Sequence, residues 1–234
     1  SHELITEKIE ETSGSIEFSL DDKYIFYSKL DEHHRPRKIF RHELGTSVKE
    51  DQLIFEEKSE AFTVSIGLSS DEKYFFISTS DHNTSEQYYF KANEENPKPK
   101  LIKERKRGII YSVDSWNRYF YNHTNENAED FKIDRCKDLS NQIWEEYIPA
   151  KEEVLIGGLL FLNEWVVRSE ISNALSKLIL KDPITNNEEE IIFSKEKVIV
   201  PGISLTQKSR NTDFVYLSYS SPKTPGRTYL YNLK

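Results

Sequence analysis

The chain has 234 residues, 36% of them hydrophobic and 31% charged, and a formal net charge of -8. This length suits one large all-β domain or at most two small domains, while a mean hydropathy of -0.68 and the lack of any apolar run near about 18 residues argue against a membrane protein. The acidic balance argues against a nucleic-acid partner and is compatible with a cationic ligand.

The N-terminal segment carries the one plausible helix. Residues 3–11 predict a short helix or, equally, the frayed end of a strand. We therefore assign residues 1–12 to a partial strand or short helix and residues 13–234 to one β-rich domain. The sequence contains no methionine, which predicts that it begins inside a longer gene product with a truncated N-terminus.

A short phrase recurs along the rest of the chain: small polar residues, a turn, then aromatic and β-branched residues. Five copies are visible, and they cover residues 19–28, 69–78, 115–121, 162–167 and 211–218. Their first aromatic residues, at positions 24, 74, 119, 165 and 214, are 50, 45, 46 and 49 residues apart. A period of about 48 residues is typical of a β-propeller blade of four strands.

Further strands are expected after each copy, because polar turns alternate with runs rich in Tyr, Phe, Ile and Val. The third strands are expected at residues 38–44, 87–91, 131–136, 176–181 and 227–231, and the fourth at 52–56, 100–104, 143–147 and 190–193. The sequence thus predicts an all-β chain, a partial β-propeller of about five repeats with three or four strands each. A two-sheet sandwich is the structural alternative, but it does not predict a phrase repeated five times.

No catalytic, metal-binding or phosphate-binding motif is present. The nearest approach to a nucleophile elbow, Gly202-Ile203-Ser204, lacks the second glycine of G-x-S-x-G and a following helix. The adjacent His33 and His34 are expected in a solvated loop, and Gly157-Gly158 in a bulge or a tight strand contact. We therefore assign no catalytic residue, no metal ligand and no cofactor.

Two other features have a structural interpretation. The single cysteine, Cys136, cannot form an internal disulfide and is expected to be a buried thiol, so a reducing compartment, the cytoplasm, is the natural location. The basic run at residues 103–107 could suggest an anionic ligand, but on an outer strand leading into a turn it is better explained as edge-strand charge that blocks pairing with other chains.

Several distinctive strings resemble those of a known family. They include Arg41-His42-Glu43-Leu44-Gly45-Thr46 within residues 31–46, the Arg105-Lys106-Arg107-Gly108 turn, and Trp144-Glu145-Glu146-Tyr147-Ile148-Pro149. The closing example is Ser220-Ser221-Pro222-Lys223-Thr224-Pro225. In these strings the chain, from about residue 14 to 233, resembles the propeller domain of the oligopeptidase B (protease II) group of the prolyl oligopeptidase family of serine peptidases.

The resemblance implies a specific organisation and function. In that family a seven-bladed propeller covers an α/β-hydrolase domain that carries the Ser, Asp and His residues, and short peptides are cut after Arg or Lys. The chain would supply four to five blades, with the catalytic domain lying beyond residue 234. It would then act as a noncatalytic segment that gates access for short basic peptides.

The alternative is a free-standing propeller-like scaffold that binds protein partners. Within the distinctive strings, Arg35, Arg41 and His42 are candidates for structural or interdomain contacts, and ordinary loop-to-strand packing explains them equally well. Unpaired edge strands at both ends also allow an edge-to-edge dimer of the chain. Neither a nucleic-acid nor a membrane partner is expected.

Overall fold

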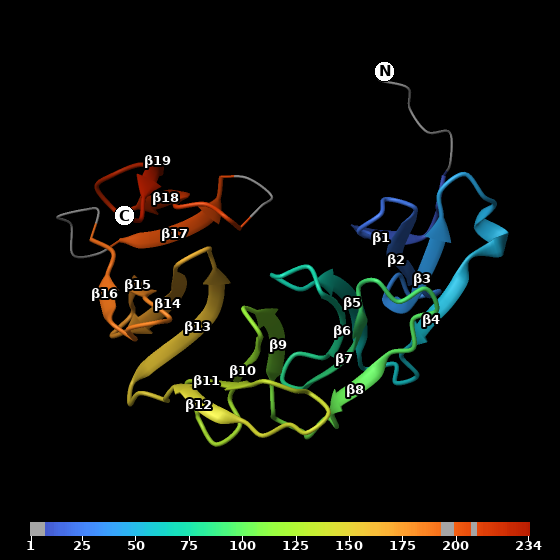
Figure 1. Ribbon diagram of the computed structural model, residues 1–234, viewed down its shortest axis with the longest axis horizontal. Coiled ribbons are helices and arrows are strands. Elements are labelled where there is room, and N and C mark those ends of the chain that lie inside the picture. The colour runs from blue at the N-terminus through green and yellow to red at the C-terminus, as the bar shows by residue number, and fades with distance from the viewer. Residues whose placement is uncertain (1–7, 193–198, 207–209) are drawn as a thin grey trace. The chain divides into compact units, whose positions relative to one another are not determined.

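The structure is a computed structural model, and it describes residues 8–192, 199–206 and 210–234. These residues form five separate sheets, in each of which the strands follow one another in chain order (Figure 1). The first four sheets have four strands each, and the fifth has three within the described ranges. Sheets of consecutive strands are the blades of a β-propeller, so the predicted partial propeller is confirmed and the two-sheet sandwich is excluded.

Each blade is described by the bounds of its strands. The first contains β1 (Thr12–Phe18), β2 (Tyr24–Leu30), β3 (Pro36–Glu43) and β4 (Gln52–Glu56), with a 3-10 helix at Val48–Glu50. The second contains β5 (Thr63–Leu68), β6 (Tyr74–Ser80), β7 (Ser85–Lys91) and β8 (Lys100–Lys103). The third contains β9 (Tyr111–Trp116), β10 (Tyr119–Thr124), β11 (Lys132–Cys136) and β12 (Glu145–Ile148). The fourth contains β13 (Val154–Phe161), β14 (Val166–Ser172), β15 (Leu175–Lys181) and β16 (Glu188–Glu190), and the fifth β17 (Val200–Leu205), β18 (Phe214–Ser220) and β19 (Arg227–Asn232).

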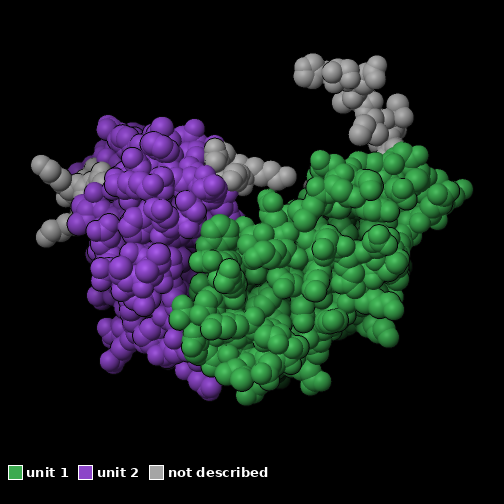
Figure 2. Space-filling model, in the orientation of Figure 1, with its two compact units in different colours: residues 1–122, 135–145 green, residues 123–134, 146–234 purple. Residues whose placement is uncertain are grey.

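The chain divides into two compact units, which Figure 2 colours separately. Unit 1 comprises residues 1–122 and 135–145, and unit 2 comprises residues 123–134 and 146–234. The first two blades belong to unit 1, and the last two belong to unit 2. Residues of the third blade fall in both units.

The repeated phrase is a hairpin turn between the first and second strands of a blade. In the first blade the Ser19 hydroxyl donates to Asp21 at 2.7 Å and accepts from the Tyr24 amide at 2.9 Å. In the second blade Ser69 repeats these contacts with Asp71 and Tyr74 at 2.9 and 3.0 Å. In these two blades the second strand therefore begins at the aromatic residue that marks the repeat, because the same local hydrogen bonds end both turns.

Hydrophobic layers lie between neighbouring sheets. In unit 1, one layer joins the first two blades through Phe26, Ile39, Val64, Ile66, Phe75, Ile77 and Phe90. In unit 2, another joins the last two blades through Leu162, Val167, Leu178, Leu180, Ile191, Val215, Leu217 and Leu233. Apolar residues on alternate positions of the strands thus stack sheet on sheet, as a propeller requires.

The adjacent glycines of β13 form the expected bulge. The register between β13 and β14 shifts between Ile156 and Leu159, where Gly157 and Gly158 lie. A Cβ atom at Gly157 would overlap the Ser169 side chain, whereas one at Gly158 would have nothing within 4 Å. Close strand packing therefore requires a glycine at position 157.

The expected helix or strand at residues 3–11 falls mostly outside the described residues. Residues 8–11 are in neither a helix nor a strand, and β1 begins at Thr12. The last part of the strand expected at 190–193 also lies outside them. None of the helices within the described ranges is long and apolar enough to cross a membrane.

Candidate functional site

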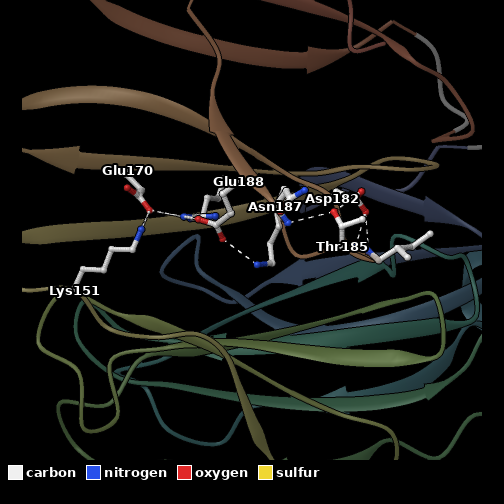
Figure 3. Close-up of polar contacts among 9 residues, drawn as sticks. Lys151, Glu170, Asp182, Thr185, Asn187 and Glu188 are labelled. Carbon is white, nitrogen blue, oxygen red and sulfur yellow. Dashed lines mark hydrogen bonds and ion pairs between the residues drawn. The ribbon is translucent and has the colours of Figure 1, made fainter.

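The most extensive polar cluster in unit 2 lies on one face of the fourth blade (Figure 3). Arg168 and Glu170 are two residues apart in β14, so they share a face of the sheet. Across the strand pair, Glu170 is opposite Lys177 and, one strand further, Lys181 is opposite Glu188. The register therefore gathers charges of both signs on one face. We call Lys151, Arg168, Glu170, Lys177, Lys181 and Glu188 the β14 network.

Short ion pairs link the members of the β14 network. Arg168 Nη2 donates to Glu170 Oε1 at 2.7 Å and to Glu188 Oε2 at 2.6 Å. Lys181 Nζ donates to Glu188 Oε1 at 3.0 Å, and Lys151 Nζ donates to Glu170 Oε1 at 2.6 Å. Each of the two carboxylates is thus shared between cations from different strands or turns.

Burial makes these ion pairs matter energetically. Arg168 and Glu170 are each only 2% exposed, and Lys181 is 6% exposed. Burial opposes ionisation of Glu188, but hydrogen bonds from Arg168 and Lys181 outweigh it and lower the pKa of Glu188 to about 2. The pKa of Glu170 is also lowered, because Lys151 and Arg168 outweigh its burial. Both carboxylates are therefore charged at neutral pH.

A tight hairpin turn places Glu188 opposite Lys181. The Asp182 carboxylate accepts the Ile184 amide at 2.7 Å and the Thr185 hydroxyl at 2.7 Å (Figure 3). The Asp182 amide in turn donates to the Asn187 carbonyl at 2.9 Å. These local bonds fix the length of the turn, and the length of the turn fixes which residue of β16 faces Lys181.

A second ion-pair cluster, in unit 1, joins the first two blades. Arg105 Nη2 donates to Glu57 Oε2 at 2.7 Å and to Glu86 Oε1 at 3.0 Å, and the guanidinium lies 4.1 Å from the centre of the Phe62 ring. Glu86 also accepts the Tyr88 hydroxyl at 2.7 Å. Glu57 follows β4, Glu86 lies in β7 and Arg105 follows β8. We call Glu57, Phe62, Glu86, Tyr88 and Arg105 the Arg105 network.

The Arg105 network corrects the interpretation of the basic run at residues 103–107. Only Lys103 belongs to a strand, and Arg105 does not serve as solvated edge charge. Its side chain is 28% exposed and pairs with two carboxylates whose side chains are 4% and 7% exposed. Lys106 and Arg107 are exposed, so the edge-strand explanation fails at Arg105 because stacked sheets bring Glu57 and Glu86 to it.

The three candidate contact residues lie in different surroundings of the first blade. Arg35 donates to the Glu60 and Ala61 carbonyls at 2.6 and 3.1 Å. Arg41 lies over the Tyr24 ring, 4.4 Å from its centre, and donates to Gln52 and to the Glu95 carbonyl. These two arginines therefore tie the first blade to the β4–β5 and β7–β8 connections.

His42 points to the opposite face of β3 from Arg41, because successive side chains of a strand alternate. It is fully buried, and its Nδ1 lies 2.6 Å from Asp51 Oδ1. The second oxygen of Asp51 accepts the Tyr27 hydroxyl at 2.7 Å. The structure thus does not bring Arg35, Arg41 and His42 together in one site, and whether any of them contacts another domain stays a prediction.

Residues weighed as catalytic or metal-binding candidates have ordinary structural roles. Ser204 lies in the regular β17–β18 ladder opposite Tyr216, and His33 and His34 are exposed in a loop. Cys136 is 2% exposed, and burial raises its pKa to about 11, so the expected buried thiol is confirmed. No three His, Cys, Asp or Glu residues in the described part of the chain are arranged to hold a metal ion.

Both ion-pair networks escaped the sequence interpretation, although a weak signal exists for one of them. Arg168 and Glu170 stand two residues apart in a strand that begins with Val166 and Val167. Opposite charges at alternate positions of a strand without other charged residues, here beginning with two valines, indicate a buried ion pair. No comparable local signal links Arg105 with Glu57, because 48 residues separate them.

Comparison with known proteins agrees with this architecture. Residues 1–234 match the family described as prolyl oligopeptidase, N-terminal beta-propeller domain. The chain is 30% identical to Protease 2 of Moraxella lacunata, over 94% of this chain and 31% of that protein. It is 26% identical to dipeptidyl aminopeptidase BI of Pseudoxanthomonas mexicana, over 99% of this chain and 32% of that protein.

A solved structure has the same fold. Oligopeptidase B from Trypanosoma brucei, with covalently bound antipain in a closed form, superposes with a TM-score of 0.90 at 23% identity, over 98% of this chain and 34% of that chain. The chain thus spans about a third of the length of these relatives. The resemblance indicated by the sequence strings is confirmed, and the chain belongs to the N-terminal β-propeller family of the prolyl oligopeptidases.

Proposed function

We propose that this chain is a noncatalytic propeller segment of a serine oligopeptidase that cleaves short peptides after Arg or Lys. The observation that carries the proposal is the match to Protease 2, which extends over 94% of this chain at 30% identity. In the proposed protein, an α/β-hydrolase domain outside this chain supplies the Ser, Asp and His residues.

The segment would gate access to the active site. Within each unit, ion pairs of 3.0 Å or less tie strands or neighbouring blades together. Such ties suit a cap whose blades keep their shape while it moves against a catalytic domain. Such a cap would admit short or unfolded peptides and exclude large folded proteins. The net charge of -8 would concentrate cationic peptides near the entrance.

The cytoplasm is the proposed location, since the lone cysteine is a buried free thiol rather than part of a disulfide. An edge-to-edge dimer is proposed for the isolated chain only, through strands at its two ends. In the complete protein the partner of the propeller would instead be the catalytic domain.

The test compares the 234-residue chain with the complete product of its gene. A fluorogenic Arg-Arg substrate should be hydrolysed by the complete product and not by the chain, and a matched Ala-Ala substrate should react far more slowly. Activity on the Ala-Ala substrate alone would contradict the Arg or Lys specificity. Activity in neither protein would favour the protein-binding scaffold, and activity in the isolated chain would contradict its noncatalytic role.

Gating and electrostatic attraction need separate measurements. The complete product should cleave an Arg-containing decapeptide much faster than a large folded protein that exposes the same sequence in a loop. Its kcat/KM for the decapeptide should fall as salt rises, because salt screens long-range attraction. Equal rates on both substrates would contradict gating, and a kcat/KM independent of salt would contradict electrostatic concentration.

A further inference from the structure

A cavity in unit 1 combines aromatic rings with unpaired hydrogen-bond donors. Its volume is about 430 Å³, within the usual range of small-molecule sites. The rings of Tyr74, Tyr89 and Phe120 line it, together with charged residues from the β7–β8 hairpin and the segment after β11. This cavity is separate from both ion-pair networks, none of whose members line it.

The strand register explains why these groups converge. Tyr74 of β6 is opposite Lys91 of β7, and Tyr89 of β7 is opposite Lys100 of β8. Directly opposite residues of paired strands share a face, so two phenol rings and two ammonium groups lie at one end of the second blade. Phe120 completes the wall with its ring centre 5.1 Å from that of Tyr74.

The far wall of the cavity is held in place by its own hydrogen bonds. Leu139 is 3% exposed within a hydrophobic cluster against which Tyr74 and Tyr89 pack. The neighbouring Asp138 carboxylate accepts the Ser140 amide and hydroxyl, each at 2.8 Å. The Asp138 carbonyl also accepts the Gln142 amide at 2.9 Å. These local bonds therefore order the segment after β11 where it lines the cavity.

The hydrogen-bond donors of the cavity that have no partner in the described part of the chain favour an anion as the ligand. The side chains of Lys91 and Lys100 and the hydroxyls of Tyr74 and Tyr89 make no hydrogen bond or ion pair with any described residue. Lysines in the lining outnumber carboxylates, since Lys137 joins Lys91 and Lys100 against Glu94 and Asp138. The Asp138 carboxylate already accepts hydrogen bonds from Ser140, so the hydrogen-bond donors that line the cavity exceed the acceptors available to them.

Both tyrosines remain donors over a wide pH range. Burial and the nearby Asp138 raise the pKa of Tyr89, and burial with Asp71 raises the pKa of Tyr74. Their rings also offer flat apolar surface, against which another ring can stack or pack edge-on.

We propose that this cavity binds a small organic anion that carries a planar ring. The ring packs against Tyr74, Tyr89 and Phe120, and the anionic group accepts hydrogen bonds from Lys91 and Lys100. Charge-assisted bonds of this kind are stronger than neutral ones, and two lysines that line the same cavity fit a carboxylate or a phosphate. Two sources share this chemistry, the free carboxylate end of a peptide with an aromatic last residue and a nucleotide. This inference does not depend on the proposed peptidase function.

Isothermal titration calorimetry on the complete gene product tests the proposal with two ring-bearing anions, N-acetylphenylalanine and adenosine monophosphate. N-acetylphenylalaninamide has the ring without the charge, and inorganic phosphate has the charge without the ring. We expect saturable binding of at least one ring-bearing anion, about tenfold or more tighter than either control, which corresponds to about 1.4 kcal/mol. The ring-bearing anion that binds more tightly identifies the source.

Substitutions then locate the site. The double variant Lys91→Gln/Lys100→Gln should weaken binding about tenfold or more. The matched double variant Lys58→Gln/Lys223→Gln removes the same charge from exposed positions outside the cavity and should change affinity less than twofold. Tyr74→Phe/Tyr89→Phe keeps both rings and should weaken binding through loss of the hydroxyls. The proposal is wrong if neither ring-bearing anion binds, if the amide binds as tightly, or if the two lysine pairs have equal effects.

Discussion

Lys181 and Glu188 face each other across β15 and β16, and their side chains meet at 3.0 Å. Glu188 also accepts Arg168 Nη2 at 2.6 Å, so one carboxylate bridges cations of two other strands. Lys181 lies 5.1 Å from the centre of the Tyr147 ring, and its side chain is 7% exposed. Because little water reaches Lys181 and Arg168, their charges depend on the carboxylates of the β14 network for stabilisation.

Replacing Arg168 with Met should be strongly destabilising. The change keeps an unbranched side chain but removes the cation that joins Glu170 to Glu188, and Glu170 is 2% exposed. Breaking a buried ion pair from one side costs about 3–5 kcal/mol, so we expect a loss of about 3 kcal/mol in the free energy of unfolding, measured by urea denaturation.

The matched control is Lys151→Met, which also removes a cation from Glu170. Its side chain is 37% exposed, so the expected loss is about 1 kcal/mol or less. Equal losses for the two variants would show that burial does not determine the strength of the network.

The free energy of unfolding should fall as the pH is lowered, because a carboxylate of the β14 network becomes protonated. The pKa of Glu188 is lowered to about 2 in the folded chain from an ordinary value of 4.5. The folded state therefore holds fewer protons than the unfolded state between these values, and its stabilisation, complete above about pH 4.5, is lost as the pH falls toward 2. The urea midpoint should drop across this window.

The variant Glu188→Gln isolates this contribution, because glutamine is nearly the same size and does not titrate. Between pH 4.5 and 2 the variant should lose less stability than the original chain, although it starts from a lower value at pH 7. Parallel curves for the two proteins in this window would contradict the assignment of the acid sensitivity to Glu188.

Arg105 should matter for stability far more than its neighbours in the basic run. Arg105→Ala would leave Glu57 and Glu86, 4% and 5% exposed, without their shared cation. We expect a loss of about 3 kcal/mol in urea denaturation, whereas Arg107→Ala, at an exposed position, should stay within about 0.5 kcal/mol. Arg105→Lys should fall between them, since it keeps the charge but loses the planar guanidinium over Phe62. Similar small losses at positions 105 and 107 would restore the edge-strand explanation.

The parts of the fold that follow from local chemistry could be predicted from the sequence. Ser19 and Ser69 end their turns through hydrogen bonds to residues two and five positions along, so in the first two blades the repeated phrase encodes its own hairpin. Because aromatic and β-branched runs follow those turns, the first residue of each second strand could be located to within one residue, whereas the predicted runs at 115–121 and 162–167 stop three and five residues before β10 and β14 end. The fourth strand of the first blade was predicted with the bounds that the structure has, 52–56.

The ion-pair networks could not be predicted in the same way, because their partners meet through pairing and stacking. Glu188 reaches Lys181 only if the turn at residues 182–187 has its observed length, and a shift of one residue would send Glu188 to the other face. Arg105 meets Glu57 only when two blades stack. The cavity beside Tyr74 likewise needs the register of β6, β7 and β8 together with the segment after β11.

The two glycines of the β13 bulge should respond differently to the same substitution. Gly157→Ala places a Cβ atom against the Ser169 side chain and 3.2 Å from its carbonyl oxygen, so β13 must shift away from β14. Overpacking of this kind costs about 1–3 kcal/mol, while Gly158→Ala, with nothing within 4 Å, should change the free energy of unfolding by less than about 0.5 kcal/mol. Adding Ser169→Gly to Gly157→Ala should recover part of the loss, beyond the effect of Ser169→Gly alone, because it removes the nearest atoms. A double-mutant cycle in urea measures this recovery, and strictly additive losses would contradict the predicted contact.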